Sequence, residues 1–206
     1  MILADERTGR WAVMGDATTG EAVIEACKRG DREAFRLLFE CHRDRVYTVA
    51  LYFFGGDEAT ASDVTQQVFL KLFSRVGQFK GESEFTTWLY RLATNACIDE
   101  QRKRRRFLPF GDATELAGMR ARGSAEGAAE RTEVADSVKR AVAALKPKLR
   151  VVVLLKYFEE LSYEEMAAAL GCSKGTVASR LNRGHKILAR RLGHLRGALG
   201  GAGQGS

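Results

Sequence analysis

The sequence predicts an all-α protein made of two small helical domains joined by a flexible linker. Apolar residues recur every three or four positions instead of alternating, which is the spacing of helices that bury one face. Prolines interrupt the chain only at Pro109 and Pro147. The chain has 206 residues, of which 45% are hydrophobic and 29% charged, so it has the composition of a folded protein and the length for two small cores.

The first domain is expected at residues 17–106 and begins with two helices. The spacing of apolar residues predicts a short helix that Gly30 ends. A longer helix follows over residues 35–53, and the glycine pair at 55 and 56 closes it. Glycine suits these ends because it adopts left-handed backbone conformations at little cost.

Two further helices complete the first domain. Residues 64–76 carry an unusually wide apolar face, with Phe69 and Phe73 beside the regular stripe, so part of this face is expected to serve a partner. Residues 85–96 supply Phe85, Leu89 and Leu92 to the core, and the helix runs on into the basic segment QRKRRR at 101–106.

Three segments lack the helical pattern. Residues 107–132 are rich in Gly, Ala and charge, which predicts a linker. Fully extended, about 25 residues reach roughly 80 Å, so the two domains could occupy well-separated sites on one partner. Residues 1–16 and the glycine-rich residues 194–206 are predicted to be a disordered extension and a disordered tail.

The second domain, predicted at residues 133–193, contains the pattern of a helix-turn-helix. Ser162 and Glu165 have the spacing of a capping box, in which each side chain accepts a hydrogen bond from the other residue's backbone amide. Gly171 can end that helix and Ser173 can begin the next. In a DNA-binding helix-turn-helix the second of these helices enters the major groove.

The helix after Ser173 separates apolar from polar side chains. Val177, Leu181 and Leu188 fall on one side of it. The polar side chains gather on the opposite side and are of types that read base edges: Ser179, Asn182, Arg183 and Lys186. Glu165 is the last acidic residue of the chain, whereas basic residues continue to Arg196. The alternative is a basic, solvated helix of an ordinary bundle.

The last helix of the first domain carries a second polar stripe, away from its core face. Its members are spaced by three, four and seven residues: Trp88, Arg91, Asn95 and Arg102. Aromatic rings stack on unpaired bases and cations follow the backbone, so this stripe suits an unpaired strand. Taken alone, Trp88 is more often a half-buried core residue, and the basic residues 102–106, Lys103 among them, are more often a solvated helix end.

Charge and cysteine usage narrow the class of protein. The net charge of +7 and the pI near 9.4 favour a polyanionic partner, either nucleic acid or an anionic membrane. The first twenty residues contain charges that a signal peptide excludes, and the longest aliphatic run, residues 151–155, is too short to span a bilayer. Cysteines at 27, 41, 97 and 172 lack metal-ligand spacing and are expected to be reduced, partly buried thiols. We expect a cytoplasmic protein without metal or cofactor.

Three segments together resemble the extracytoplasmic-function (ECF) sigma factors of the sigma-70 family. They are DVTQQVFLKLF at 63–73, FKGESEFTTWLYRLATNACIDEQRKRRR at 79–106, and YFEELSYEEMAAALGCSKGTVASRLNRGHKIL at 157–188. The match covers both predicted domains in order and most of residues 20–192. In that family the first domain is region 2 and the second is region 4, which together direct RNA polymerase to promoters.

The resemblance implies roles for the first domain. The helix at 63–73 matches the surface that docks on the clamp helices of the polymerase beta-prime subunit, and we assign to it Asp63, Gln66, Gln67, Phe69, Leu70 and Phe73. The segment at 80–84 matches the loop that captures a flipped base of the minus-ten element, with candidates Lys80, Gly81, Glu82 and Ser83. Asn95 falls where the family often has a polar reader of that element. The family often has Glu where Gln67 stands.

For the second domain the resemblance implies recognition of the minus-thirty-five element. The matching segment runs from Lys174 to Lys186 and adds Thr176 and Arg180 to the polar residues of that helix. Asn182 lies at a variable position of the family. The apolar surface of this domain would contact the polymerase beta flap. An anti-sigma factor, which in many relatives is membrane-bound, would be a further partner and could hold the protein at the membrane. Otherwise the protein is expected at the nucleoid.

Two other classes of protein are the alternatives. A helix-turn-helix regulator that acts without joining the polymerase would normally carry a receiver or ligand-binding domain, and residues 17–106 lack the α/β periodicity of such domains. An enzyme acting on nucleic acid would need clustered carboxylates, metal-ligand histidines or a phosphate loop. The histidines at 42, 185 and 194 are isolated and GxxxxGK[ST] does not occur. We therefore expect a protein that is not an enzyme.

Overall fold

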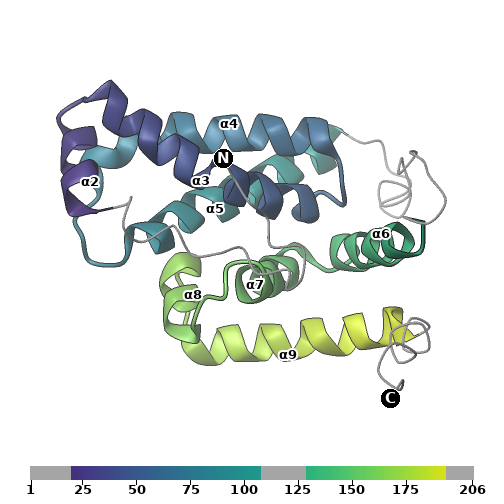
Figure 1. Ribbon diagram of the computed structural model, residues 1–206. Coiled ribbons are helices and arrows are strands. Elements are labelled where there is room, and N and C mark those ends of the chain that lie inside the picture. The colour runs from purple at the N-terminus through teal and green to yellow at the C-terminus, as the bar shows by residue number, and fades with distance from the viewer. Residues whose placement is uncertain (1–19, 108–128, 194–206) are drawn as a thin grey trace, which may run out of the picture.

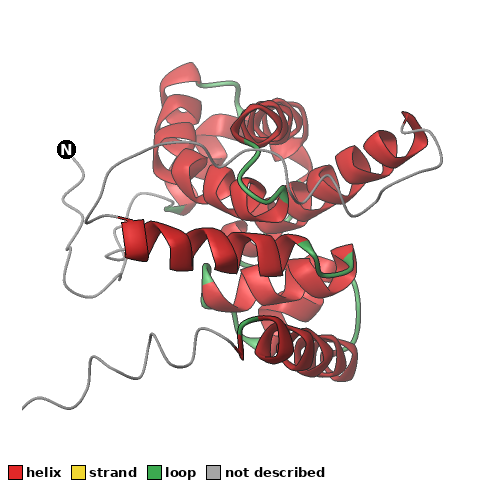
Figure 2. Cartoon of the chain, turned by 90° about the vertical axis from the view of Figure 1, so that its right-hand side faces the viewer, coloured by secondary structure: helices red, strands yellow, loops and turns green. Residues whose placement is uncertain are grey.

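Helices are the regular elements of the part of this chain that the structure describes. The computed structural model describes residues 20–107 and 129–193, and within those ranges every regular element is helical, with no strand (Figures 1 and 2). The all-α prediction is confirmed. The predicted N-terminal extension at 1–16, the tail at 194–206 and most of the linker lie outside the described residues. Within the described residues, no helix has the length and apolarity needed to cross a membrane.

The first domain consists of α2 (Glu21–Lys28), α3 (Arg32–Phe53), α4 (Glu58–Arg75), the short 3-10 helix η1 (Val76–Gln78) and α5 (Phe85–Phe107). Aspartates begin two of these helices: Asp31 accepts from the amides of Glu33 and Ala34, and Asp57 accepts from the amide of Thr60. The predicted ending of α3 is also observed, since Gly55 and Gly56 have φ values of 69° and 93°.

A buried core holds α3, α4 and α5 together. It draws on Leu38 and Phe53 from α3, Val68 and Leu72 from α4, and Leu89 from α5, all of which are inaccessible to solvent. Phe69 belongs to this core as well. It is 4% exposed and its ring packs edge-on against Phe39 at a centroid distance of 4.8 Å.

The second domain consists of α6 (Ala129–Ala143), α7 (Pro147–Tyr157), α8 (Tyr163–Leu170) and α9 (Lys174–Arg191). Helix α6 begins within the predicted linker, four residues ahead of the predicted domain boundary at 133, because its first turn, AERT, contains good helix formers that a search for apolar residues overlooks. The predicted linker therefore ends before Ala129 instead of at residue 132.

The helix-turn-helix pattern is confirmed at each predicted position. Ser162 and Glu165 form the capping box, with donor–acceptor distances of 2.7 and 3.2 Å. Gly171 has the left-handed φ of 58° that ends α8. Ser173 then accepts from the amide of Thr176 at 3.2 Å and begins α9.

A glycine lets α9 approach α7 closely. A Cβ atom at Gly184 would lie 2.9 Å from Cγ2 of Val153, which is nearer than carbon atoms can pack. Gly184 is buried beside Val177 and Leu181. On the buried side of α9, Gly184 lies one turn after Leu181 and one turn before Leu188. The apolar pattern of the sequence has no large residue at this turn.

The two domains are packed against each other. In Figure 1 the helices α2–α5 lie above α6–α9, and α3 and α5 contact the second domain. Helix α3 packs against α6 and α7, and α5 packs against α8. Buried residues of both domains form one continuous hydrophobic cluster. The sequence predicted two domains on a linker and gave no indication of this shared interface.

Candidate nucleic-acid interface

Helix α9 presents a polar face to solvent, which we call the reading face. Its members are the four residues predicted from the helical wheel, all of them exposed: Ser179, Asn182, Arg183 and Lys186. Val177, Leu181 and Gly184 are buried on the opposite side. This division leaves one amide, one guanidinium and one ammonium group free to approach base edges or phosphates.

Three other predicted members of this interface have partners within the domain. Lys174 Nζ lies 2.6 Å from Glu164 Oε1, which joins the two helices of the helix-turn-helix at their exposed ends. Arg180 is half-buried and its Nη1 lies 3.7 Å from Cys172 Sγ. The Thr176 hydroxyl pairs with the Ser173 hydroxyl at 2.9 Å. These side chains stabilise the turn in this structure, whereas the reading face stays open.

Helix α5 carries the second predicted polar stripe, which we call the strand stripe: Trp88, Arg91, Asn95 and Arg102. Arg91, Asn95 and Arg102 are exposed. Trp88 is half-buried, as its type alone would suggest, and its ring packs at centroid distances of 5.5 Å from Phe79 and 6.0 Å from Phe85. Trp88 is therefore held against two rings of the core, whereas the polar members of the stripe are exposed.

The loop before α5 is open to solvent. Lys80, Gly81 and Glu82 are exposed and Ser83 is half-buried. Gly81 has a φ of 74°, which suits a sharp turn that few other residues adopt without strain. The loop is anchored at its start by Phe79, which is 9% exposed and packs on Trp88. It therefore lies next to the tryptophan of the strand stripe.

The basic end of α5 is held by acidic partners. Arg102 and Lys103 pair with Asp99 and Glu100, each at 3.5 Å and three residues away on the same helix. Arg104 Nη2 lies 2.9 Å from Asp57 Oδ2, which joins the end of α5 to the start of α4. Exposed pairs of this kind contribute little to stability, so Arg102 and Lys103 can exchange them for phosphates.

The predicted polymerase-docking surface on α4 is narrower than the sequence suggested. Leu70 is 65% exposed and Phe73 is 57% exposed, although the Phe73 ring rests edge-on against Phe35 at 5.0 Å. Asp63 and Gln66 are exposed beside them, and Gln67 is half-buried. Phe69 must be withdrawn from the surface set, because it points into the core against Phe39. We call the remaining five residues the docking face.

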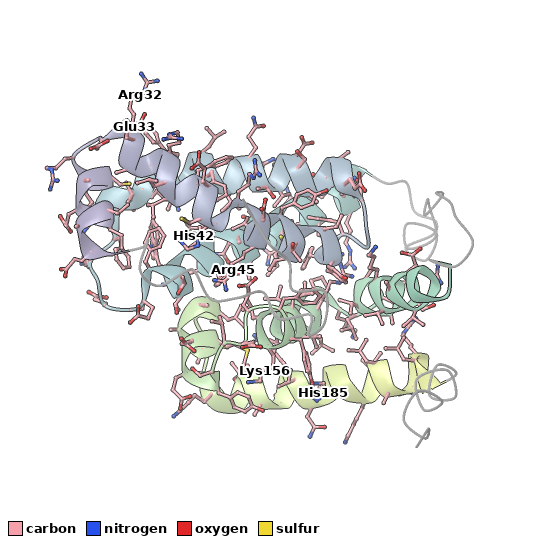
Figure 3. All side chains as sticks on the ribbon, viewed as in Figure 1. Arg32, Glu33, His42, Arg45, Lys156 and His185 are labelled. Carbon is pink, nitrogen blue, oxygen red and sulfur yellow. The ribbon has the colours of Figure 1, made fainter. Side chains whose placement is uncertain are left out.

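Sequence reasoning missed a set of polar residues between the domains, which we call the interdomain junction: Arg45, Tyr90, Arg150 and Glu159. The Tyr90 hydroxyl donates to the Glu159 carboxylate, and Arg45 Nε lies 3.9 Å from the same carboxylate. Figure 3 shows Arg45 on α3 where the first domain meets the second. The sequence contains one signal of this junction, because Arg150 is a charged residue directly before the aliphatic run Val151–Leu155.

Arg150 lies where the C-terminal ends of two helices meet. It is 5% exposed and donates to the backbone carbonyls of Val142, Ala143 and Leu145 in its own domain, and to that of Phe53 at the end of α3. Burial lowers the pKa of Arg150 to about 10, which still leaves it charged at neutral pH. A buried cation is stabilised here by helix-end carbonyls, which carry partial negative charge.

The cysteines lie as expected for structural thiols. Cys27 and Cys97 are buried, whereas Cys41 and Cys172 are half-buried, and all are free. Burial raises the pKa of Cys97 to about 12, so its thiol is unreactive at neutral pH. Among the residues that the structure describes, no group of three or more His, Cys, Asp or Glu is placed to hold a metal ion.

Comparison with known families identifies both domains. Residues 38–107 match the family model of sigma-70 region 2, which covers most of α3 and all of α4 and α5. Residues 135–188 match that of sigma-70 region 4, which covers most of α6 through α9. The strand stripe and the docking face fall in the first match and the reading face in the second.

Relatives resemble the chain over most of its length. The chain is 32% identical to the ECF RNA polymerase sigma factor SigW of Bacillus subtilis, over 82% of this chain and 94% of that protein. It is 33% identical to the sigma-H factor of Pseudomonas aeruginosa (84% and 93%) and 31% identical to the ECF sigma-E factor of Escherichia coli K12 (87% and 97%).

Solved structures share the fold. CnrH, solved with the cytosolic domain of CnrY, matches with a TM-score of 0.64 at 24% identity, over 85% of this chain and 98% of that one. The sigma factor RpoE of Bartonella quintana, solved with the anti-sigma factor NepR, matches with a TM-score of 0.59 at 22% identity, over 77% and 96%. Together with the matches to both regions and to full-length relatives, these findings show that the chain belongs to the ECF group of the sigma-70 family, which are transcription initiation factors that bind RNA polymerase core and direct it to promoters.

Proposed function

We propose that the two domains divide promoter recognition between them. The second domain reads the minus-thirty-five element through the reading face of α9. The first domain binds the polymerase through the docking face and holds the minus-ten strand through the strand stripe and the loop at 80–84. The observation that carries this proposal is the reading face, whose exposed Asn182, Arg183 and Lys186 lie opposite a fully packed inner side.

The docking face supports polymerase binding by its exposed apolar area. Leu70 and Phe73 together expose more apolar surface than the packing of α4 requires, since Val64, Val68 and Leu72 already fill the core. Leu70→Glu should weaken binding to core polymerase at least about tenfold, because burying a leucine contributes roughly 1.5 to 3 kcal/mol. Gln78→Glu, an exposed charge change on η1, is the control. Normal core binding by folded Leu70→Glu protein would remove the docking face from the proposal.

The strand stripe supports a role in opening DNA. Parting base pairs costs on the order of 1 to 2 kcal/mol for each step, and stacking on Trp88 with capture of a base near Asn95 would offset it. Transcripts that appear on overexpression supply a promoter for the test. With core polymerase, Asn95→Ala should fail on that duplex promoter and recover on a template whose minus-ten region is already unpaired.

Permanganate footprinting gives a direct readout of this step. Thymines in the minus-ten region should react in the wild-type complex and lose reactivity with Asn95→Ala. A wild-type pattern of reactive thymines with the variant would contradict the assignment of α5 to strand opening. The pre-opened template separates this result from loss of polymerase binding, because a docking defect fails on both templates.

The proposed location of the protein in the cell follows from where its partners are found. The protein acts in the cytoplasm, at the nucleoid, where polymerase and promoter DNA are found, and the polymerase supplies the chemistry. An anti-sigma factor is a proposed partner, and it would act by covering surfaces that the polymerase or the promoter needs. RpoE of Bartonella quintana, which shares this fold, was solved with such a protein.

A further inference from the structure

Helix α2 lies ahead of the region 2 match, which begins at residue 38. It packs on α3 and on η1, and it buries Ile24 and Cys27. In Figure 1 it stands at the end of the first domain where the chain turns from η1 into α5. Helix α2 is therefore a neighbour of the loop at 80–84, which is proposed to capture a base.

Three aromatic rings, which we call the ring cluster, join the two ends of this loop: Phe79, Phe85 and Trp88. Phe79 directly precedes the loop and Phe85 directly follows it, and their rings meet edge-on at a centroid distance of 5.6 Å. The Trp88 ring lies 5.5 Å from that of Phe79 and 6.0 Å from that of Phe85. The position of the loop relative to Trp88 therefore depends on where the Phe79 ring lies.

The end of α2 places a cation over this ring. Lys28 Nζ lies 5.6 Å from the centroid of the Phe79 ring, close enough for attraction to the negative face of the ring. The Glu25 carboxylate lies 2.7 Å from the same nitrogen and keeps the ammonium group in place. The Lys28 side chain is 23% exposed, so water weakens the attraction only in part. Lys28 therefore couples the position of α2 to that of Phe79.

A loop that captures a base binds it more tightly when it is held ready. Ordering a side chain or a loop at the moment of binding costs affinity, and a pre-organised site avoids that cost. The backbone of Phe79 is fixed by its amide, which donates to the Val76 carbonyl at 3.1 Å. The Phe79 ring has contacts of its own, with the rings of α5 and with Lys28.

We propose that Lys28 is a positioning residue for the capture of an unpaired base. Its ammonium group holds the Phe79 ring, and through that ring it fixes the loop at 80–84 against Trp88. This proposal rests on the proposed function, because it uses the loop and the strand stripe assigned there. It extends the strand-binding machinery to α2, which acts on the base through Phe79 and does not touch it.

A direct contact with a DNA phosphate is the other role open to a lysine at this place. The Lys28 ammonium is already shared between the Glu25 carboxylate and the Phe79 ring, which favours positioning. A phosphate contact would strengthen binding whether or not a base is present. A positioning residue strengthens binding only when there is a base to capture, so the two roles can be separated.

The first measurement reports on the ring cluster in the free protein. The sequence contains two tryptophans, so Trp11→Phe leaves Trp88 as the single fluorescent tryptophan. In this background Lys28→Gln should increase the quenching of Trp88 by acrylamide, because the Phe79 ring loses a contact. Arg29→Gln, the same charge change at the next, exposed residue, should leave the quenching unchanged. Lys28→Arg should also leave it unchanged, since a guanidinium binds ring faces as well.

The second measurement uses holoenzyme assembled from core polymerase and each variant. It is titrated with a single-stranded oligonucleotide that carries the non-template minus-ten sequence, and with versions that lack one base each. The missing base that weakens wild-type binding most marks the captured position. Lys28→Gln should weaken binding of the intact oligonucleotide about two- to fivefold, as expected for a partly exposed cation over a ring. The loss should disappear on the oligonucleotide without the captured base, and Lys28→Arg should restore wild-type binding.

The outcomes distinguish this proposal from the proposed function. Equal losses on both oligonucleotides would make Lys28 a phosphate contact and overturn its positioning role. Unchanged quenching of Trp88 in Lys28→Gln protein that keeps its helices by circular dichroism would overturn it as well. If no missing base weakened wild-type binding, base capture by the loop would fail, and the quenching result would still decide whether Lys28 holds the ring cluster.

Discussion

Helices α5 and α9 both carry a stripe proposed to bind DNA, but they are buried differently. Helix α9 buries one side, at Val177, Leu181 and Gly184, and leaves its reading face open. Helix α5 buries a wider arc, because Tyr90 and Thr94 are 2% exposed in addition to its core residues. Its stripe is a narrow strip beside the second domain. The proposed DNA-binding surface of α9 is therefore set within its own domain, whereas the accessibility of the proposed surface on α5 depends on where the second domain lies.

The largest expected effect comes from breaking the hydrogen bonds of Arg150, which help to hold the second domain against the first. Arg150→Met keeps an unbranched apolar stem but removes the donor from four backbone carbonyls. Each buried acceptor left without a partner costs about 1 kcal/mol or more, so we expect a loss of about 3 to 5 kcal/mol in the free energy of unfolding. Urea unfolding of the full chain measures it.

Lys148→Met is the control for this change, since Lys148 is an exposed residue of the same helix. It should alter the free energy of unfolding by less than about 0.5 kcal/mol. A loss below about 1 kcal/mol for Arg150→Met would mean that the carbonyls find other donors and that Arg150 is not needed to join the domains.

A pH titration should sharpen the comparison through Glu159. Burial raises the pKa of Glu159 to about 7 from an ordinary value of 4.5, against the opposing effects of the Tyr90 hydroxyl and of Arg45. Between pH 4.5 and 7 the packed domains therefore hold a proton on Glu159 that separated domains would release. The packing of the two domains is most stable below about pH 4.5, loses stability as pH rises through about 7, and changes by at most about 3 kcal/mol in all.

Scattering of the wild-type chain from pH 5 to 8 measures this change, and the radius of gyration should increase with pH. Glu159→Gln should flatten the curve, since it keeps the shape and cannot ionise. The nearby His42 does not contribute above pH 5, because burial, with the Arg45 charge, lowers its pKa to about 4 (Figure 3). A pH slope that persists in Glu159→Gln would assign the effect to another group.

The reading face of α9 should be tested by a change that leaves α5 unaffected. Arg183→Ala should lose about 1 to 3 kcal/mol of promoter binding and relax specificity at one position of the minus-thirty-five element, if the guanidinium reads a base. Arg190→Ala, nearer the end of the helix, should act weakly and equally on all sequences. Equal losses on every promoter variant for Arg183→Ala would make Arg183 a phosphate contact instead.

The smallest expected effect concerns the packing that sets the reading face. Gly184→Ala forces α9 away from Val153, at a cost of about 1 to 3 kcal/mol that the better helix propensity of alanine offsets by about 1 kcal/mol. We expect a net loss of about 1 kcal/mol in thermal or urea unfolding. Gly175→Ala, where the nearest other atom is 3.9 Å away, should instead stabilise slightly. Equal effects at both sites would contradict the close approach of α7 and α9.

Much of the local structure of this protein can be predicted from its sequence, because it depends on residues that are close together in the chain. The capping box at Ser162 and Glu165, the left-handed Gly171 and the cap at Ser173 each depend on residues at most three positions apart, and all are observed. The reading face follows from the same short-range order, because a helix places residues three and four apart on one side. The sequence by itself therefore determined the all-α class, the helix-turn-helix and the exposed polar side of α9.

Tertiary structure alone decided which surfaces are covered. Tyr90 and Glu159 meet across 69 positions of the chain, and Arg150 reaches Phe53 across 97. No periodicity links residues so far apart, since the contacts exist only when the two domains dock. The same reason explains Phe69, whose place on α4 fits either the core or the surface until Phe39 of α3 packs against it. Helical periodicity gives each residue a side of its helix, and only the packing of helices decides which side meets solvent.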